Sequence, residues 1–211
     1  MKTEQLVAAL VADRAAGTRS PGRTLSLAVL LGGVISLGLF FAALGVREDI
    51  APALATWRFD FKLVVVLLAL VVAFALCRAL GRPEPVAHPS RYLLPLLMLA
   101  AMAVAMELAI APVAAWRTRL VGSNSLVCLA AVPVLSLAPL VAVLAMLRSA
   151  APASPALAGA AAGLLSAATG AALYAFHCFD DSPLFVVTWY TLATVPMVVI
   201  GALAGRRLLR W

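Results

Sequence analysis

Two cysteines are the residues of this chain whose type and position could do chemistry. Cys128 opens the fourth of six long apolar segments, and Cys178 closes the fifth. If those segments cross a bilayer in turn, both thiols emerge at the same membrane face. Two sulfur atoms at one face can join as a disulfide or bind a soft metal ion. The pair therefore predicts a redox or metal sensor in an otherwise apolar protein.

The neighbours of Cys178 leave both kinds of sensor open. His177 precedes it, and the acids Asp180 and Asp181 follow. Two thiolates and an imidazole suit a soft metal, although the sequence lacks the C-x-x-C or H-x-x-x-H spacing of common metal sites. We expect the carboxylates to raise a thiol pKa and to attract a cation. They could also cap the sixth helix and keep this loop in water.

Cys128 lies near the start of its segment. If Ser125 caps that helix, Cys128 is the third helical residue, where the positive end of the helix dipole favours a thiolate. The leucines and valines around it oppose this effect, because loss of hydration favours the neutral thiol. The sequence leaves that balance undecided.

The elements that carry these residues are membrane helices. Of the 211 residues, 64% are apolar, against roughly 45–50% in soluble domains. Six stretches approach the roughly 20 residues that a helix needs to cross a bilayer, and they lack the alternation of a transmembrane barrel. The predicted fold is all-α, a polytopic bundle of six transmembrane helices. We place them at Leu25–Val46, Phe61–Leu80, Tyr92–Ala111, Ser125–Leu147, Ala156–Phe176 and Leu184–Ala204.

Basic residues predict the orientation of the bundle. With a cytoplasmic N-terminus, eleven of the sixteen lysines and arginines lie on the inner side. This asymmetry favours both termini in the cytoplasm. The net charge of +7 then follows from topology and from contact with anionic lipid headgroups, so it requires no direct contact with nucleic acid. Cys77 would lie at the inner, reducing side, whereas Cys128 and Cys178 would face outward.

Residues 1–24 form a predicted cytoplasmic segment, separate from the transmembrane domain at residues 25–211. Thr3 can cap a short amphipathic helix that ends near Ala15, with Leu6 and Leu10 on one stripe. A helix of about twelve residues is marginal alone in water. We therefore expect it either to lie on the membrane or to become ordered on a partner protein.

Residues inside the apolar segments divide between packing and chemistry. Gly159 and Gly163 have the spacing that lets two membrane helices approach closely, and Pro133 and Pro139 predict kinks. Glu107 is the one acid within an apolar core segment. Such acids often relay protons or ions, but this one lies near enough to the outer boundary to reach the headgroups, Arg117 or Arg119.

The last third of the chain resembles a known family. HCFDDSPLF at residues 177–185, Trp189-Tyr190 and the terminal GRRLLRW at residues 205–211 resemble the NrsF family, as do MKTEQL at the start and LSLAPL at residues 135–140. These are six-helix inner-membrane negative regulators of extracytoplasmic-function (ECF) sigma factors in proteobacteria. One departure is Phe179-Asp180, where the family has a small residue or proline followed by glutamate.

The resemblance implies a non-enzymatic anti-sigma factor in the bacterial inner membrane, without a cofactor. Its N-terminal segment would bind an ECF sigma factor, with the contacts at Lys2, Thr3, Glu4, Leu6 and Leu10. The outward cysteines would respond to metal or oxidative stress, assisted by the adjacent histidine and aspartates, and would cause release.

Two other functions remain as alternatives. A membrane thiol-disulfide oxidoreductase would pass electrons to quinone, but such enzymes generally need two cooperating cysteine pairs, and only one pair faces outward here. A small transporter is disfavoured because the apolar segments carry few polar groups. The sequence has no phosphate-binding glycine loop, no HExxH motif and no serine nucleophile beside a base.

Overall fold

The computed structural model describes residues 21–210, and this part of the chain is helical without a strand. Six of its helices are long and apolar enough to cross a membrane. The predicted fold class is therefore confirmed. Residues 1–20 of the predicted N-terminal segment lie outside the described residues, and with them all five predicted sigma-factor contacts, Lys2, Thr3, Glu4, Leu6 and Leu10.

The long helices alternate with short ones that lie in the connections. The short elements are α3, the 3₁₀ helix η1, α6, α9 and the π-helical η2, of which the sequence predicted none. In chain order the elements are α2 (Pro21–Ala43), α3 (Ile50–Ala53), α4 (Trp57–Leu80), η1 (Pro89–Leu93), α5 (Leu94–Ile110), α6 (Val113–Val121), α7 (Ser125–Leu147), α8 (Pro155–Tyr174), α9 (Pro183–Phe185), η2 (Val186–Tyr190) and α10 (Thr191–Leu208).

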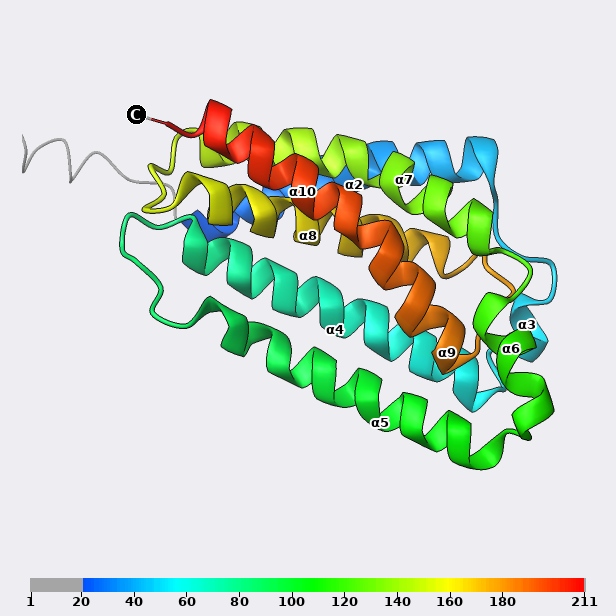
Figure 1. Ribbon diagram of the computed structural model, residues 1–211. Helices are drawn as coiled ribbons and strands as arrows, with labels where there is room; N and C mark the ends of the chain where they lie inside the picture. Colours follow the sequence, from blue (N-terminus) through cyan, green and yellow to red (C-terminus); the bar gives the residue numbers. More distant parts are fainter. Residues whose placement is uncertain (1–20, 211) are drawn as a thin grey trace, which may run out of the picture.

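The long helices run antiparallel, so the connections gather at two ends of the bundle (Figure 1). One end holds residues 44–56, 111–124 and 175–182, and we call it the outer end. The other holds residues 81–88 and 148–154 together with the ends of α2 and α10, and we call it the inner end. Cys128 and Cys178 both belong to the outer end, as the order of the segments predicted.

The predicted spans agree with the helices to within about four residues at most boundaries. α2 begins and ends earlier than expected, α4 begins at Trp57 instead of Phe61, and α10 continues to Leu208. The N-cap of α7 is Asn124, so Ser125 is its first helical residue and the predicted Ser125 cap is wrong.

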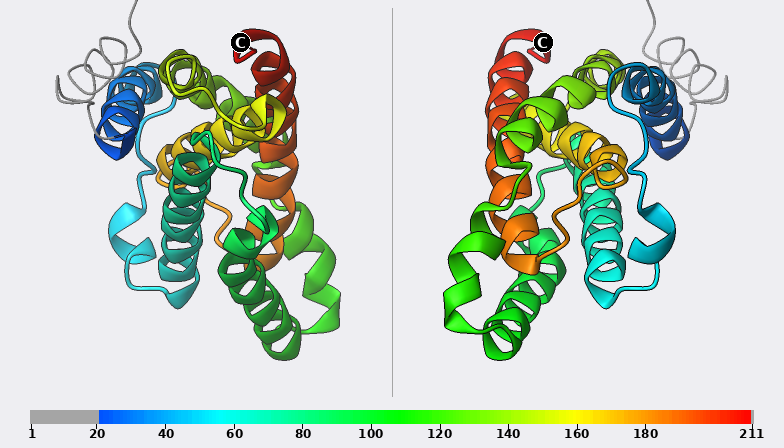
Figure 2. Two further views of the ribbon diagram at one scale, coloured as in Figure 1. Left: turned by 90° about the vertical axis from the view of Figure 1, so that its left-hand side faces the viewer. Right: turned by 90° about the vertical axis from the view of Figure 1, so that its right-hand side faces the viewer.

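α8 lies at the centre of the bundle because its side chains are small (Figure 2). It packs against α2, α4, α7 and α10. A Cβ atom added to Gly159 would lie 2.2 Å from the Gly201 carbonyl oxygen, and one added to Gly163 would lie 2.1 Å from that of Met197. The predicted close approach through Gly159 and Gly163 is therefore confirmed. Its partner is a second glycine pair on α10, Gly201 and Gly205.

A proline explains how α2 joins α7. Pro139 has no N–H, so the carbonyl of Leu135 loses its usual helical donor. The buried Ser36 hydroxyl of α2 donates a hydrogen bond to that carbonyl over 2.6 Å. Gly32, one turn earlier on α2, permits this approach, since a Cβ atom there would lie 2.4 Å from the Pro139 Cα. The proline thus creates a polar link between two apolar helices.

α5 lies at the edge of the bundle and diverges from it (Figures 1 and 2). Only Ala103 and Glu107 are buried along its length. Its main contacts are with α4, η1 and α9. A cavity separates its middle from α8 and α10.

Candidate functional site

The loop between α8 and α9, residues 175–182, connects the elements of the outer end. Its residues are held by partners from the α2–α3 connection, α4, α5 and the start of α7. We call it the Cys178 loop. Few backbone groups of so short a loop can bond to one another, so side chains from other elements fix its shape.

Two cations donate hydrogen bonds to the backbone of Cys178. Arg47 Nη1 donates to the Cys178 carbonyl over 3.0 Å, and Lys62 Nζ donates to the same oxygen over 2.7 Å. Lys62 comes from the first turns of α4 and is fully buried, and Arg47 is nearly so. Cations at the C-terminal end of a helix also offset the negative pole of its dipole, which here belongs to α8.

Asp181 balances the charge of these two cations. It forms ion pairs with Arg47, over 2.9 Å, and with Lys62. Asp49 binds Arg47 from the other side through two hydrogen bonds of 2.6 and 2.7 Å. Because the Arg47 guanidinium donates to it, the pKa of Asp49 lies below its ordinary value. We call Arg47, Lys62 and Asp181, together with the Cys178 carbonyl, the clamp.

Phe179 also contacts the clamp. The Arg47 guanidinium lies over the Phe179 ring, 4.9 Å from its centroid. Such a contact between a cation and an aromatic face is worth about 0.5–1 kcal/mol where it is exposed. The Phe179 ring therefore covers the Arg47 guanidinium.

Asp180 binds the start of α7. Its Oδ2 accepts hydrogen bonds from the backbone N–H groups of Ser123, over 2.9 Å, and Asn124, over 2.8 Å. Gly122 enters this turn with φ +61°, a conformation that glycine adopts without strain, and a Cβ atom there would lie 2.6 Å from the Asp180 carboxyl carbon. The acid therefore caps the helix that carries Cys128, and the expectation that it caps the sixth helix is wrong.

Ser182 links the loop to Glu107 on α5. Its hydroxyl donates to Glu107 Oε1 over 3.3 Å. The same carboxylate is fully buried and also pairs with Arg119 over 2.5 Å and with Arg58 over 3.1 Å. The predicted pairing with Arg119 is confirmed, whereas the partner from α4 was not expected. Two of the three donors are arginines, whose charges stabilise the ionised carboxylate and oppose a proton-relay role.

Both thiols are buried beneath this loop. Cys128 and Cys178 have 0% exposure and belong to one apolar cluster with Phe185, Tyr174 and Tyr190. Burial raises the pKa of the Cys178 thiol above its ordinary value, and the nearby Lys62 charge opposes that shift. The Cys178 thiol faces the Asp180 carbonyl at 3.7 Å. Both thiols are therefore shielded from water and do not lie on the protein surface.

Cys128 is the fourth helical residue of α7, one position later than predicted. Its N–H already donates to the Asn124 carbonyl over 2.8 Å. The predicted position among the unpaired donors of the first turn is therefore wrong, and its environment is apolar instead.

The histidine does not join the thiols. His177 Nδ1 lies 3.1 Å from the Gly45 carbonyl, so that nitrogen carries the proton and acts as the donor. Within residues 21–210, no group of three or more His, Cys, Asp or Glu side chains is placed to hold a metal ion. In this conformation, His177 fastens the loop to the α2–α3 connection.

Comparison with known proteins identifies the family. The NrsF family, described as "Negative regulator of sigma F", matches residues 10–211. This chain belongs to the NrsF family. It is 34% identical over 215 residues to the anti-sigma-F factor NrsF of Caulobacter vibrioides (strain NA1000 / CB15N), and the match covers both chains fully. It is also 34% identical over 216 residues to the probable anti-sigma-F factor NrsF of Azospira oryzae, again over the full length of both. No solved structure matches this chain.

The sequence did not single out the cations of this NrsF-family site. Arg47, Arg58 and Lys62 are among the five basic residues assigned to the outer side, where basic residues are disfavoured. Each of the three binds a carboxylate in the structure. The signal available in the sequence was that these cations lie on the side where the positive-inside rule predicts few basic residues.

Removing one cation should weaken the outer end. In Lys62→Met, Asp181 keeps Arg47 but loses its buried partner, and the Cys178 carbonyl loses a donor. Breaking a buried ion pair costs roughly 3–5 kcal/mol, and we expect about 3 kcal/mol here because Arg47 remains. The measurement is the midpoint of thermal unfolding in detergent.

The matched control for this variant is Arg117→Met, which removes an exposed cation from the same end. It should unfold as the wild type does. Equal effects of the two substitutions would show that general charge, not the clamp, stabilises this end.

Proposed function

We propose that this chain is a membrane-bound anti-sigma factor that holds an ECF sigma factor at the bacterial inner membrane. It releases the sigma factor when Cys128 and Cys178 are modified. The observation that carries this proposal is the full-length match to two anti-sigma-F factors, joined to six apolar helices. The role is regulatory and not catalytic.

The proposal that the N-terminal segment reaches a cytoplasmic partner rests on the distribution of charge and on the order of the helices. Four of the five cations assigned to the outer side, Arg47, Arg58, Lys62 and Arg119, are engaged by acids. The excess positive charge therefore belongs to the inner end, where α2 begins and α10 ends. That distribution supports cytoplasmic termini and an N-terminal segment within reach of a cytoplasmic sigma factor.

The sensing side rests on how the Cys178 loop is held. The carbonyl of Cys178 is the oxygen that Arg47 and Lys62 share, so a shift of the Cys178 backbone on modification of its sulfur would disturb both hydrogen bonds. Loosening this contact frees the first turns of α4, which continues to the inner end. Release then follows if the two arrangements bind the sigma factor with different affinity.

A disulfide fits the sensor better than a metal complex. His177 is committed to the Gly45 carbonyl, and Asp180 and Asp181 are committed to α7 and to the clamp. A metal ion would have to displace these partners to gain more than two ligands, whereas a disulfide needs only the two sulfur atoms.

Deleting residues 1–15 should abolish binding of the sigma factor. Leu6→Asp with Leu10→Asp should have the same effect, because both substitutions charge the apolar stripe of the segment. The measurement is co-purification from membranes. Thr18→Ala, in the adjoining linker, is the control and should retain the partner; an intact complex after the deletion would contradict this assignment.

Replacing the outer thiols should block release without blocking binding. Cys128→Ser and Cys178→Ser should each retain the sigma factor after treatment with diamide, which oxidises thiol pairs, whereas the wild type releases it. Cys77→Ser is the control, because that thiol is equally buried but lies at the inner end. A parallel treatment with Cd²⁺ separates metal binding from oxidation. Normal release from the double variant would overturn the sensor assignment.

The orientation of the chain in the membrane can be tested with introduced cysteines. The native outer thiols are unsuitable because they have 0% exposure and are not accessible to a labelling reagent. In a cysteine-free background, Thr118→Cys reports the outer end and Ser149→Cys the inner end. Both positions are exposed. An impermeant maleimide added to spheroplasts should label only Thr118→Cys. The reverse pattern would place the N-terminal segment on the wrong side for a sigma factor.

A further inference from the structure

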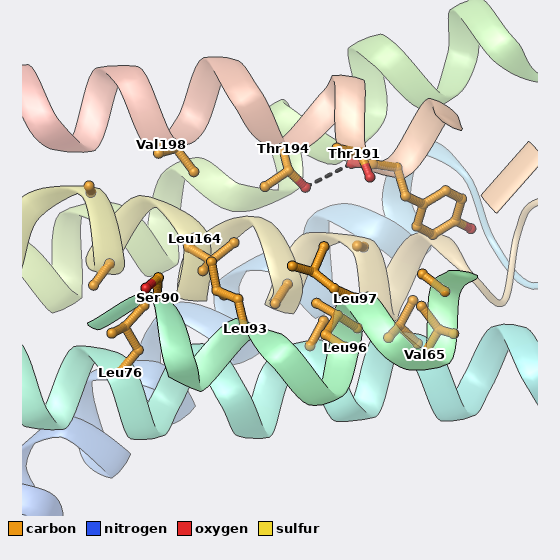
Figure 3. Close-up of a pocket in the computed structure, with 18 of the residues that line it drawn as sticks. Val65, Leu76, Ser90, Leu93, Leu96, Leu97, Leu164, Thr191, Thr194 and Val198 are labelled. Carbon is orange, nitrogen blue, oxygen red and sulfur yellow. Dashed lines mark hydrogen bonds between the residues drawn. The ribbon is translucent and has the colours of Figure 1, made fainter. Parts of the chain in front are cut away.

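A cavity of about 440 Å³ lies inside the membrane-spanning part of the bundle (Figure 3). It separates α5 from α8 and α10, and α4 forms its floor. Leu76, Leu93 and Leu164 line one part of it, and Val65 and Thr191 line another. Its volume falls within the range of roughly 300–1,000 Å³ that is typical of small-molecule sites.

The cavity reaches the lipid-facing surface. Leu97 and Leu157 line it and are 59% and 47% exposed. Both belong to membrane-spanning helices, so a molecule would enter from the hydrocarbon phase. The lining is almost entirely apolar, which requires an occupant with a long apolar body.

One wall of the cavity is shared with the cluster that contains the thiols. Val66, Ala171, Val186 and Tyr190 line the cavity and also pack in the cluster of Cys128 and Cys178. The clamp and the Cys178 loop cover the thiols on the outer side, where their exposure is 0%. This wall therefore lies between the cavity and the sulfur atoms, and the charged groups of the clamp are not part of it.

Tyr190 supplies a polar group at this wall. The residue is 6% exposed, and its hydroxyl is the one buried side-chain oxygen or nitrogen without a hydrogen-bond partner in residues 21–210. Cys178, Cys128 and Tyr174 are its electrostatic neighbours, and the Cys178 side chain is close enough to act on the hydroxyl directly. A buried hydroxyl without a partner costs roughly 1–3 kcal/mol, so an occupant with a hydrogen-bond acceptor gains by reaching it. A lipid acyl chain offers no acceptor at its buried end.

The π-helical turn places Tyr190 at this wall. η2 ends at Tyr190, and the Thr194 hydroxyl donates to the Tyr190 carbonyl over 2.7 Å (Figure 3). Widened turns of this kind occur frequently at functional sites.

We propose that the cavity binds a membrane quinone, with its isoprenoid tail among the leucines and its ring at Tyr190, and that this quinone oxidises the thiol pair. The S–H bonds of Cys128 and Cys178 break and one S–S bond forms. The two electrons and two protons pass to the quinone, which leaves as the quinol. A carbonyl oxygen of the ring accepts the hydrogen bond of Tyr190.

This inference rests on the proposed function, because it identifies the oxidant that the sensor reads. The sigma factor would then be released when the membrane pool is rich in oxidised quinone. Release requires the thiols to react only once, so a single outward pair is sufficient.

The test uses the full chain in nanodiscs without oxygen, with decylubiquinone as the probe. Two readouts are taken: the quinone retained after washing, and the disulfide detected as loss of labelling by a maleimide polymer after denaturation. The wild type should retain the probe and form one disulfide for each quinone reduced. Decylubiquinol should produce none.

Ala100→Phe fills the cavity from α5, and Ala101→Phe is its control, because Ala101 is an exposed neighbour outside the lining. The filled variant should lose at least about tenfold in both readouts, while the control should match the wild type. Tyr190→Phe should retain less quinone although it folds normally, since the missing hydroxyl has no partner to lose.

Diamide distinguishes this inference from the proposed function. If diamide forms the disulfide and releases the sigma factor but decylubiquinone forms none, the quinone site is refuted and the sensor remains. Equal behaviour of Ala100→Phe and Ala101→Phe would also refute the cavity assignment. If the chain binds no sigma factor yet is oxidised by quinone, the proposed function fails and the site stands.

Discussion

The outer end of this protein depends on a single carbonyl oxygen. The Cys178 carbonyl accepts hydrogen bonds from Arg47 and Lys62, whose charges Asp181 balances in a largely buried setting. A buried cation without a partner is expensive, so all the members of the clamp must be present together. Because the two cations and the acid come from different connections and helices, the clamp fixes α4 and the α2–α3 connection to the Cys178 loop.

Three consecutive residues of the Cys178 loop connect it to α7 and α5 as well. Asp180 caps α7, Asp181 completes the clamp, and Ser182 reaches Glu107 on α5. A shift of the Cys178 backbone therefore reaches three separate partners. Within residues 21–210, the helices of the apolar interior meet mainly through apolar and small side chains, and the polar contact between them is the hydrogen bond from Ser36 to the Leu135 carbonyl. The polar contacts thus concentrate in the layer that contains the thiols.

Much of the fold could be predicted from the sequence, because helix formation is obligatory for an apolar segment of this length. Once the segments are taken as antiparallel helices, the close approach at the glycines of α8 and the placement of Cys128 and Cys178 at one end can be predicted too. The partners of Asp180 and Glu107 were only partly predictable, since Ser123 and Arg58 are brought there by packing between distant segments. Hydropathy carries no information on such pairings. The π-helical turn and the cavity beside α5 likewise depend on how whole helices pack.

The widened turn at Val186–Tyr190 has a mechanical consequence. A π-turn holds one residue more than an α-turn, so tightening it would rotate the chain on one side by about 100° relative to the other. α10 resists that twist, since Gly201 and Gly205 lock its backbone against α8. The rotation would instead fall on α9, the short helix that begins at Pro183. α10 is therefore held along its inner part, and any rotation is taken up at the outer end of the bundle.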